Sequence, residues 1–289
     1  LHLSIRRQRQ MCIRDRIFPG LVEMHVHTAP DVRARSLDDL ELAREAARIG
    51  AKAVVIKSHH MLTADRAIVA RSVAGNAAIY GGVTLNPSVG GLNPAVVDVA
   101  LRLGGKIVWL PTLFAVQHRR MEGKTGGIVV VEDGRVVPAA REIFSQIAAA
   151  GAILATGHQS PAEIRIIAAE ATALGVRKIL INHPEHKVVG MTLGDQKELR
   201  REFSAVFFER CFSQPSPAGY VSNIEVNARA IAEVGVESTV IATDAGQIEN
   251  PPWAECWSRY LDGLSACGIR EADIKKMAGE IPARLLAAD

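Results

Sequence analysis

Two histidines of this chain, His25 and His27, lie two residues apart at the end of a short apolar run that begins at Leu21. If this run is a strand, its period of two places both imidazoles on the same face. Neutral imidazole is the commonest metal ligand, so the two side chains could grip one ion. A His-x-His pair alone is as consistent with coincidence as with a metal site.

Three further side chains of the metal-ligand type follow apolar runs in the same way. His158 is separated by Thr-Gly from an Ile-Leu-Ala run, His183 ends the sequence Ile-Leu-Ile-Asn-His, and Asp244 ends Val-Ile-Ala-Thr-Asp. In a barrel of parallel strands, the C-terminal ends of the strands carry the chemistry. We therefore predict a divalent metal site formed by His25, His27, His158, His183 and Asp244. Zinc suits these ligands first, with manganese, iron and nickel as alternatives, and the choice between one ion and two stays open.

The elements that must position these residues alternate between short β-branched runs and longer helical patterns, which indicates βαβ units and a parallel sheet. Nearly half of the residues are apolar and few are aromatic, as suits buried strands under Ala-rich helices. The 289 residues fit one (β/α)₈ barrel of about 250 residues. The predicted strands are Leu21–His25, Ala53–Lys57, Ile79–Leu85, Lys106–Leu110, Ala152–Ala155, Lys178–Ile181, Ala205–Phe208 and Ser238–Ala242.

We predict the fold class α/β, as a single (β/α)₈ TIM barrel domain over residues 17–289. Residues 1–16 are basic and without periodicity, and we expect them to be a non-native or disordered leader. A Ser or Thr followed three residues later by an acidic residue predicts a capping box at four helix starts. These pairs are Ser36 with Asp39, Ser160 with Glu163, Thr192 with Asp195, and Ser222 with Glu225.

One connection is too long for a simple loop. Residues 127–137 alternate β-forming side chains around Asp133-Gly134, which predicts a β-hairpin insertion after the fourth strand. The insertion follows that strand on the face where barrel active sites lie, so it is either a lid or a decorative insertion.

The opening sequence Pro-Gly-Leu-Val-Glu-Met-His-Val-His, at residues 19–27, resembles that of the amidohydrolase superfamily, in which a strand ends in His-x-His. Segments 55–60, 85–94 and 108–112 are similar to an uncharacterised amidohydrolase-related family, and 281–286 resembles the superfamily's C-terminal helix. The resemblance covers nearly the whole chain. It implies the barrel and a metal, with His158, His183 and Asp244 at the fifth-, sixth- and eighth-strand positions.

The fourth strand departs from this resemblance, because it ends in Trp-Leu-Pro-Thr where many members carry a bridging carboxylated Lys or a Glu. Either the site holds one metal, or Lys57 or Glu209 replaces the bridge. Glu23 stands where the superfamily commonly has Asp, and we expect it to pack or support rather than to bind metal.

These residues predict a metal-dependent hydrolase that uses an activated water on an amide, ester or lactone bond of a small molecule. Asp244 would move the proton of that water, and Lys57 would stabilise the developing oxyanion. Candidate substrate-binding residues are His59, Asn86, His186 and Glu209, and His186 is also an alternative to His183 as a ligand. His118, before the hairpin, could meet an anionic substrate, although a solvated loop is the simpler interpretation.

Other functions remain open at this point. Decarboxylation or phosphoester hydrolysis could use the same metal site, a metal-free lyase could form a Schiff base on Lys57, and a barrel could bind a ligand without catalysis. The net charge of +3, from 34 basic and 31 acidic interspersed residues, argues against nucleic acid as a partner. Without a membrane-spanning run or a paired-cysteine motif, we expect a cytoplasmic protein with no membrane partner; homo-oligomer formation is left open.

Overall fold

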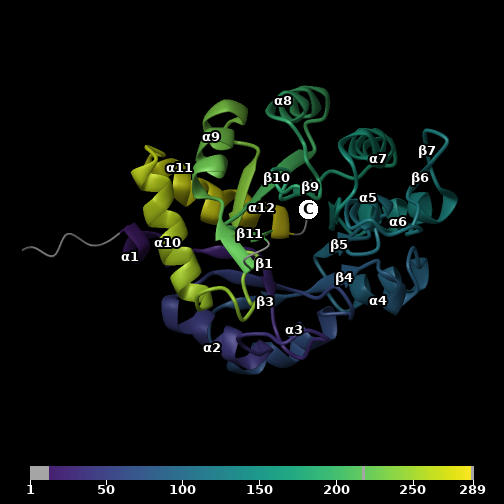
Figure 1. Cartoon of the computed structure of the whole chain (residues 1–289). Coiled ribbons are helices and arrows are strands. Elements are labelled where there is room, and N and C mark those ends of the chain that lie inside the picture. Colours follow the sequence, from purple (N-terminus) through teal and green to yellow (C-terminus); the bar gives the residue numbers. More distant parts are fainter. Residues whose placement is uncertain (1–12, 217–218, 288–289) are drawn as a thin grey trace, which may run out of the picture.

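The computed structural model describes residues 13–216 and 219–287. Within these residues, a parallel barrel with eight strand positions forms, and two short strands share the third position (Figure 1). One sheet has the order β1-β2-β3 and the other β13-β10-β9-β8-β5-β4, with every neighbouring pair parallel. The α/β barrel predicted from the sequence is confirmed. The strands are β1 (Val22–His27), β2 (Ala53–Lys57), β3 (Ala78–Tyr80), β4 (Gly82–Thr84), β5 (Ile107–Trp109), β8 (Ile153–Ala155), β9 (Ile179–Asn182), β10 (Val206–Cys211) and β13 (Thr239–Ala242).

The predicted third strand is in fact two short strands, because the chain breaks at Gly81 between β3 and β4. A Cβ atom at Gly81 would lie 2.1 Å from the carbonyl oxygen of Thr63, so only glycine allows this close approach. The first and last strands close the barrel through backbone hydrogen bonds: the Asp244 N–H donates to the His25 carbonyl at 2.9 Å, and the His27 N–H donates to the Ala245 carbonyl at 2.8 Å. This closure brings the chemistry-bearing ends of β1 and β13 together.

Helices surround the barrel and cover the outer face of its strands, whose inner face is buried in the barrel interior (Figure 1). They are α1 (Ile13–Ile17), α2 (Asp39–Ile49), α3 (Ala64–Ala70), η1 (Arg71–Val73), η2 (Pro87–Val89), α4 (Pro94–Arg102), α5 (Val116–Met121), α6 (Pro138–Ala149), α7 (Pro161–Ala173), α8 (Leu193–Glu202), α9 (Ile224–Val234), α10 (Trp253–Ala266), α11 (Glu271–Lys275), the π-helical turn η3 (Lys276–Glu280) and α12 (Ile281–Leu286).

Two of the four predicted capping boxes are present, those of Ser160 with Glu163 at α7 and of Thr192 with Asp195 at α8. The prediction for α2 was wrong by two residues. Asp38 caps that helix and Glu41 completes the box. The prediction for α9 was also wrong, because Asn223 precedes the helix and makes no side-chain cap.

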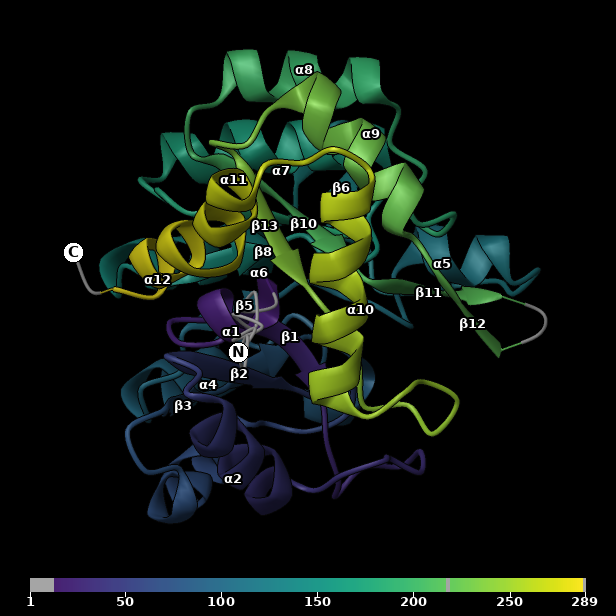
Figure 2. The same ribbon diagram turned by 90° about the vertical axis from the view of Figure 1, so that its left-hand side faces the viewer.

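Two antiparallel pairs extend from the barrel. The pair β6 (Val131–Glu132) and β7 (Arg135–Val136) follows the fourth barrel strand, and its residues line a surface groove with Ile166 and Ala173 of α7. The second pair, β11 (Ser213–Ser216) and β12 (Gly219–Ser222), follows β10 and projects from the barrel mouth (Figure 2). This second pair is not among the strands predicted from the sequence.

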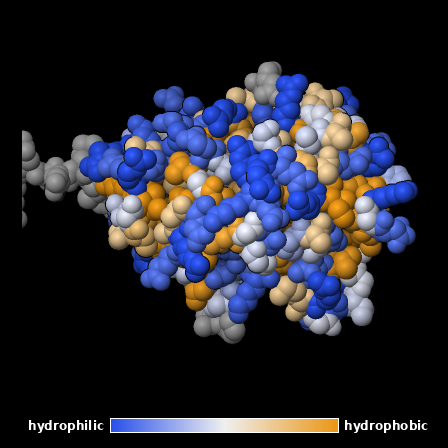
Figure 3. Space-filling model, turned by 90° about the horizontal axis from the view of Figure 1, so that it is seen from above, coloured by the Kyte–Doolittle hydropathy of each residue, from blue (hydrophilic) through white to orange (hydrophobic). Residues whose placement is uncertain are grey.

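Of the leader expected over residues 1–16, residues 1–12 lie outside the described part of the chain. The following residues begin α1, where Arg16 forms an ion pair with Glu271 at 2.6 Å and Ile17 is buried. Within the described residues, no helix is both long and apolar enough to cross a bilayer. Hydrophilic and hydrophobic residues are interspersed over the face seen in Figure 3.

Candidate metal centre

A cavity of about 550 Å³ opens at the C-terminal ends of the strands, where the sequence places its candidate residues. Residues of α5 and of the β11–β12 pair complete its wall, including His118 and Tyr220. None of residues 123–137 is among its lining residues in the described chain, so the β6–β7 hairpin does not cover the site as a lid would. The predicted residues that line it are His25, Lys57, His59, His158, His183, His186 and Asp244.

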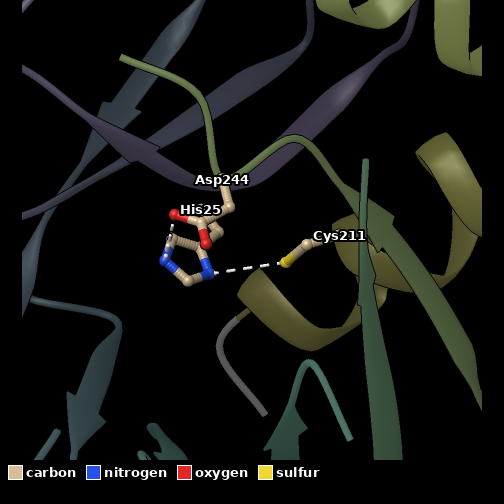
Figure 4. A group of neighbouring side chains, drawn as sticks. All are labelled: His25, Cys211 and Asp244. Atoms are coloured by element: carbon tan, nitrogen blue, oxygen red, sulfur yellow. Dashed lines mark hydrogen bonds and ion pairs between the residues drawn. The ribbon is translucent and has the colours of Figure 1, made fainter. Parts of the chain in front are cut away.

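Asp244 lies at the centre of the cluster. Its Oδ1 atom is 3.2 Å from His25 Nε2 (Figure 4). The same atom is 3.3 Å from His27 Nε2. The period of β1 therefore presents both imidazoles to one carboxylate, as its His-x-His spacing predicts. His27 is not among the residues that line the cavity, but its ring is buried directly behind Asp244.

The other edge of the His25 ring faces β10. His25 Nδ1 lies 2.9 Å from Glu209 Oε2. The same nitrogen lies 3.8 Å from Cys211 Sγ (Figure 4). Glu209 also accepts a hydrogen bond of 2.8 Å from the Asn182 side chain, and its Oε1 atom has no partner within the described chain. Glu209 thus orients His25 and does not line the cavity. Cys211 and Asn182 are not among the site residues predicted from the sequence.

A second pair of imidazoles comes from the turn after β9. The rings of His183 and His186 stack with centroids 4.3 Å apart and planes at 9°. His183 Nδ1 and His186 Nε2 are buried without a hydrogen-bond partner in the described residues. The sequence offers His186 as an alternative to His183, and the structure brings both side chains to the cavity.

The backbone at the site adopts unfavourable conformations. His183 has φ +28° and Asp244 has φ +51°, in the left-handed region that side chains rarely occupy. Gly246 follows Asp244 with φ +105°, and a Cβ atom there would lie 1.7 Å from the His27 carbonyl oxygen. Strain of this kind persists where the surrounding structure imposes it, and it concentrates at functional sites.

Burial keeps four of the site's histidines neutral. It lowers the pKa of His27 to about 3 and that of His186 to about 4, and it lowers the pKa values of His158 and His183 well below 6.5. Burial opposes ionisation of Asp244, but the neighbouring His25 and His27 outweigh it and hold the pKa of the carboxyl well below its usual range. The site therefore offers unprotonated nitrogens and a carboxylate at neutral pH, the protonation states in which these groups bind metals.

Lys57 is fully buried beside these groups. Its Nζ atom lies 2.9 Å from His25 Nε2 and 5.5 Å from the centroid of the Trp109 ring. Burial lowers the pKa of the amine, although Asp244 and Glu209 favour its charged form. An amine in this position can donate to an oxygen in the cavity, or act as a nucleophile when it is neutral.

His118 reaches the site from α5, whereas the sequence favours a solvated loop at this position. Its ring stacks on His158 with centroids 4.8 Å apart, and the two Nδ1 atoms are 2.7 Å apart. His118 Nε2 lies 3.4 Å from the carboxylate of Glu122. His158 therefore has a partner for Nδ1, which fixes the orientation of its ring.

Of His59 and Asn86, which the sequence offers as substrate-binding residues, only His59 lines the cavity. The ring of His59 is stacked on that of His27 at 4.8 Å. Asn86 lies behind it, is not among the lining residues, and bonds to Thr112 and to the His59 carbonyl. Asn86 therefore does not reach a molecule in the cavity.

Glu23 supports the site from the interior, as expected. Its Oε1 atom accepts hydrogen bonds from the His25 and Thr243 backbones. Its Oε2 atom accepts from the Thr243 hydroxyl and from the indoles of Trp253 and Trp257. Burial raises the pKa of this carboxyl to about 6, although each of these donors favours its charged form.

The donor set fits a divalent metal ion. Two groups have potential ligand atoms within 4.8 Å of one another, namely His25 with Cys211 and Asp244, and His183 with His186 and Asp244. Asp244 belongs to both groups, and two of the histidine nitrogens are buried without a partner in the described chain. Nitrogen and carboxylate ligands of this kind suit zinc and other first-row metals.

Comparison with known proteins agrees with this fold. A model described as a family of unknown function, DUF6282, matches residues 20–209. No curated protein matches the chain significantly.

Several solved structures share the barrel. An amidohydrolase from Pseudomonas aeruginosa is 14% identical with a TM-score of 0.64, over 94% of this chain and 98% of that one. An organophosphorus hydrolase from Deinococcus radiodurans is 15% identical with a TM-score of 0.58, over 93% and 94%. A 2,6-dihydroxybenzoate decarboxylase from Rhizobium is 13% identical with a TM-score of 0.52, over 92% and 98%. At these identities the likeness shows the amidohydrolase-type fold.

Proposed function

This chain belongs to the DUF6282 family of unknown function, and we propose that it is a metal-dependent hydrolase acting on an amide, ester or lactone bond of a small molecule. The observation that carries the proposal is the position of Asp244, whose Oδ1 atom lies within 3.3 Å of imidazole nitrogens of both His25 and His27 at the mouth of a barrel. Carboxylate and imidazoles converging in a cavity are the side chains that metal-assisted hydrolysis requires.

The proposed ligands are His25, His27, His158, His183 and Asp244, and the geometry adds His186 and Cys211 as candidates. A divalent ion held there, zinc first, would lower the pKa of an attacking water to about 7. Asp244 is ionised at neutral pH, so it can accept the proton of that water and pass it to the leaving group. Lys57 can stabilise negative charge on the substrate from the side of β2.

The rim of the cavity favours substrates that carry a negative charge. Lys187 is exposed, lines the cavity, and has no carboxylate partner within the described residues. Arg33 lines it too, although it pairs with Glu249 at 2.6 Å. A carboxylate or phosphate on the substrate would therefore meet unneutralised positive charge on entering.

A matched pair of substrates tests this preference. A panel of esters, lactones and amides, each with and without a carboxylate, would be assayed with metal-stripped and metal-restored protein. We expect hydrolysis only after metal is restored, and a KM about tenfold lower for the carboxylate-bearing member. Equal KM values for the two members would contradict the charge preference, and absence of hydrolysis across the panel would contradict the hydrolase proposal.

Two alternatives are retained on the same residues. One is a metal-dependent decarboxylase or phosphoesterase, because solved structures named for decarboxylation and for organophosphorus hydrolysis share the fold. The other is a metal-free lyase with a Schiff base on Lys57, which leaves the histidine cluster without a role. Trapping with borohydride in the presence of a carbonyl substrate would detect it.

A further inference from the structure

His59 lines the cavity between two of the proposed ligands. Its ring stacks on that of His27, with centroids 4.8 Å apart, and meets that of His158 edge-on at 6.2 Å. His59 Nδ1 lies 2.8 Å from the Thr112 hydroxyl, and this is the hydrogen bond that the ring makes within the described residues. What His59 can do for a bound molecule therefore depends on whether Nε2 carries a hydrogen.

Asn86 settles where the hydrogens of this network lie. Its side-chain oxygen accepts hydrogen bonds from the backbone N–H groups of Thr112 at 3.1 Å and of Phe114 at 3.3 Å. Backbone N–H groups can only donate, so the oxygen and nitrogen of this amide cannot be exchanged. Its NH₂ group must then donate, to the His59 carbonyl at 2.9 Å and to Thr112 Oγ1 at 2.8 Å.

The Thr112 hydroxyl accepts from Asn86 and has one hydrogen of its own to donate. Within the described chain, the acceptor in reach of that hydrogen is His59 Nδ1. Thr112 is buried, so water does not supply another acceptor readily. His59 Nδ1 is therefore the unprotonated nitrogen of the ring, and Nε2 carries the hydrogen.

We propose that His59 is a catalytic residue that donates a hydrogen bond from Nε2 to the substrate oxygen on which negative charge develops, and that Thr112 and Asn86 are positioning residues that hold this tautomer. The role rests on the proposed hydrolase function, whereas the tautomer does not. It assigns the substrate an acceptor oxygen, carbonyl or phosphoryl, on the β2 side of the cavity. A fixed donor aimed at developing charge needs no reorganisation during the reaction.

This donor differs from the surrounding histidines. A nitrogen that carries a hydrogen cannot bind a metal, so the tautomer separates His59 from the ligand set. Burial, with His27 and Lys57 adding to it, lowers the pKa of His59 well below 6.5, so the ring is neutral. Protonation of the ring would still leave a hydrogen on Nε2, so the donor role does not depend on the titration of His59.

The tautomer can be read directly by NMR, without an assay. Long-range ¹H–¹⁵N correlation spectra of histidine-labelled protein distinguish the two neutral tautomers, and His59→Gln identifies the resonances of His59 by their loss. We expect the Nε2–H pattern in the wild type, before and after zinc is added. Thr112→Val removes the hydroxyl and should give a mixture of tautomers, whereas Thr112→Ser keeps the hydroxyl and should restore the pattern.

Two results would overturn the assignment. An Nδ1–H pattern in the wild type would show that Thr112 accepts from His59 instead of donating to it. A pattern of His59 that changes to that of a metal-bound ring when zinc is added would make His59 a ligand. Either result is independent of whether the protein is a hydrolase, because the NMR measurement does not require turnover.

The catalytic role is tested with whichever ester, lactone or amide the metal-restored protein hydrolyses. His59→Ala should lower kcat by about 10²- to 10³-fold with little change in KM and no loss of bound metal. His59→Gln, whose side-chain NH₂ group lies near the position of Nε2, should recover part of this loss, and His59→Asn should not. An unchanged kcat in His59→Ala would overturn the role of His59, and so would a loss that coincides with loss of metal.

Discussion

Glu23 accepts hydrogen bonds from both the backbone N–H and the hydroxyl of Thr243, so the first and last strand positions of the barrel are joined directly beside Asp244. The same carboxylate accepts from Trp253 and Trp257 of α10, which places the helix against the closure. A buried carboxylate with only donors around it has a shape and polarity that a neutral amide cannot reproduce.

Replacing Glu23 with Gln should therefore destabilise the protein. The new NH₂ group must point at donors whichever way the amide turns, and each buried donor left unpaired costs about 1 to 3 kcal/mol. Removing a charge whose carboxyl pKa is raised to about 6 offsets about 2 kcal/mol of this at pH 7. We expect a net loss of about 1 to 3 kcal/mol in the free energy of unfolding, measured by urea denaturation.

Glu237→Gln is the matched control, because Glu237 pairs with Lys276 on the surface, where such pairs contribute less than about 1 kcal/mol. Equal stabilities of the two variants would contradict the account of Glu23.

The stability of the metal-free protein should fall as the pH falls below about 6.5. Burial lowers the pKa of His27 to about 3 and of His186 to about 4, so between these values and 6.5 the unfolded chain binds more protons than the folded one. The stability that neutral His27 and His186 contribute is fully present above pH 6.5, and it is lost as the pH falls toward their pKa values in the folded protein. Each such histidine contributes a slope of about 1.4 kcal/mol per pH unit.

Glu23 acts in the opposite direction through its raised pKa, so the slope is best read as a difference between variants. Urea denaturation of the chelator-stripped wild type and of His186→Gln between pH 7 and 5 provides it. We expect the slope of the variant to be smaller, by up to about 1.4 kcal/mol per pH unit near pH 5, and identical slopes would argue against a buried, neutral His186.

Breaking the buried pair of Glu185 and Arg210 should disturb the metal site as well as the fold. Arg210 is fully buried and donates to Glu185, and Glu185 lies between His183 and His186. Glu185→Gln leaves the guanidinium uncompensated, and we expect a loss of about 3 to 5 kcal/mol in the free energy of unfolding. The loosened turn should weaken zinc binding by about 10- to 100-fold, measured by competition with a chelator.

Glu198→Gln controls for the change of charge, because Glu198 pairs with Arg165 on the surface at 3.3 Å. Zinc affinity unaltered in Glu185→Gln, with stability reduced, would mean that this pair supports the fold without positioning the two histidines.

Much of the barrel could be predicted from the sequence, because buried parallel strands are apolar on both faces and are followed by polar residues. The same periodicity predicts that His25 and His27 share a face, and that Asp244 ends a strand beside them. The convergence of the two imidazoles on the carboxylate of Asp244 is a consequence of barrel closure.

Features that depend on contacts between distant segments could not be predicted in this way. His118 joins the site because α5 turns back over the cavity, and the preceding sequence gives no periodic signal for that turn. Cys211 is an ordinary strand residue until the closure brings it to His25. At α2, Asp39 fits a capping box in the sequence, but Arg66 and Thr28 bind its carboxylate in the fold.

The central claim is that the histidine cluster holds a metal, and the metal content of purified protein measured by plasma mass spectrometry tests it most directly. We predict one or two divalent ions per chain, lost in the His25→Ala and His27→Ala double variant and retained in Glu237→Gln, which changes a surface ion pair. Asp244→Asn should weaken the binding, since the carboxylate belongs to both ligand groups. Wild-type protein without bound metal, even after incubation with zinc, manganese or iron, would contradict the account.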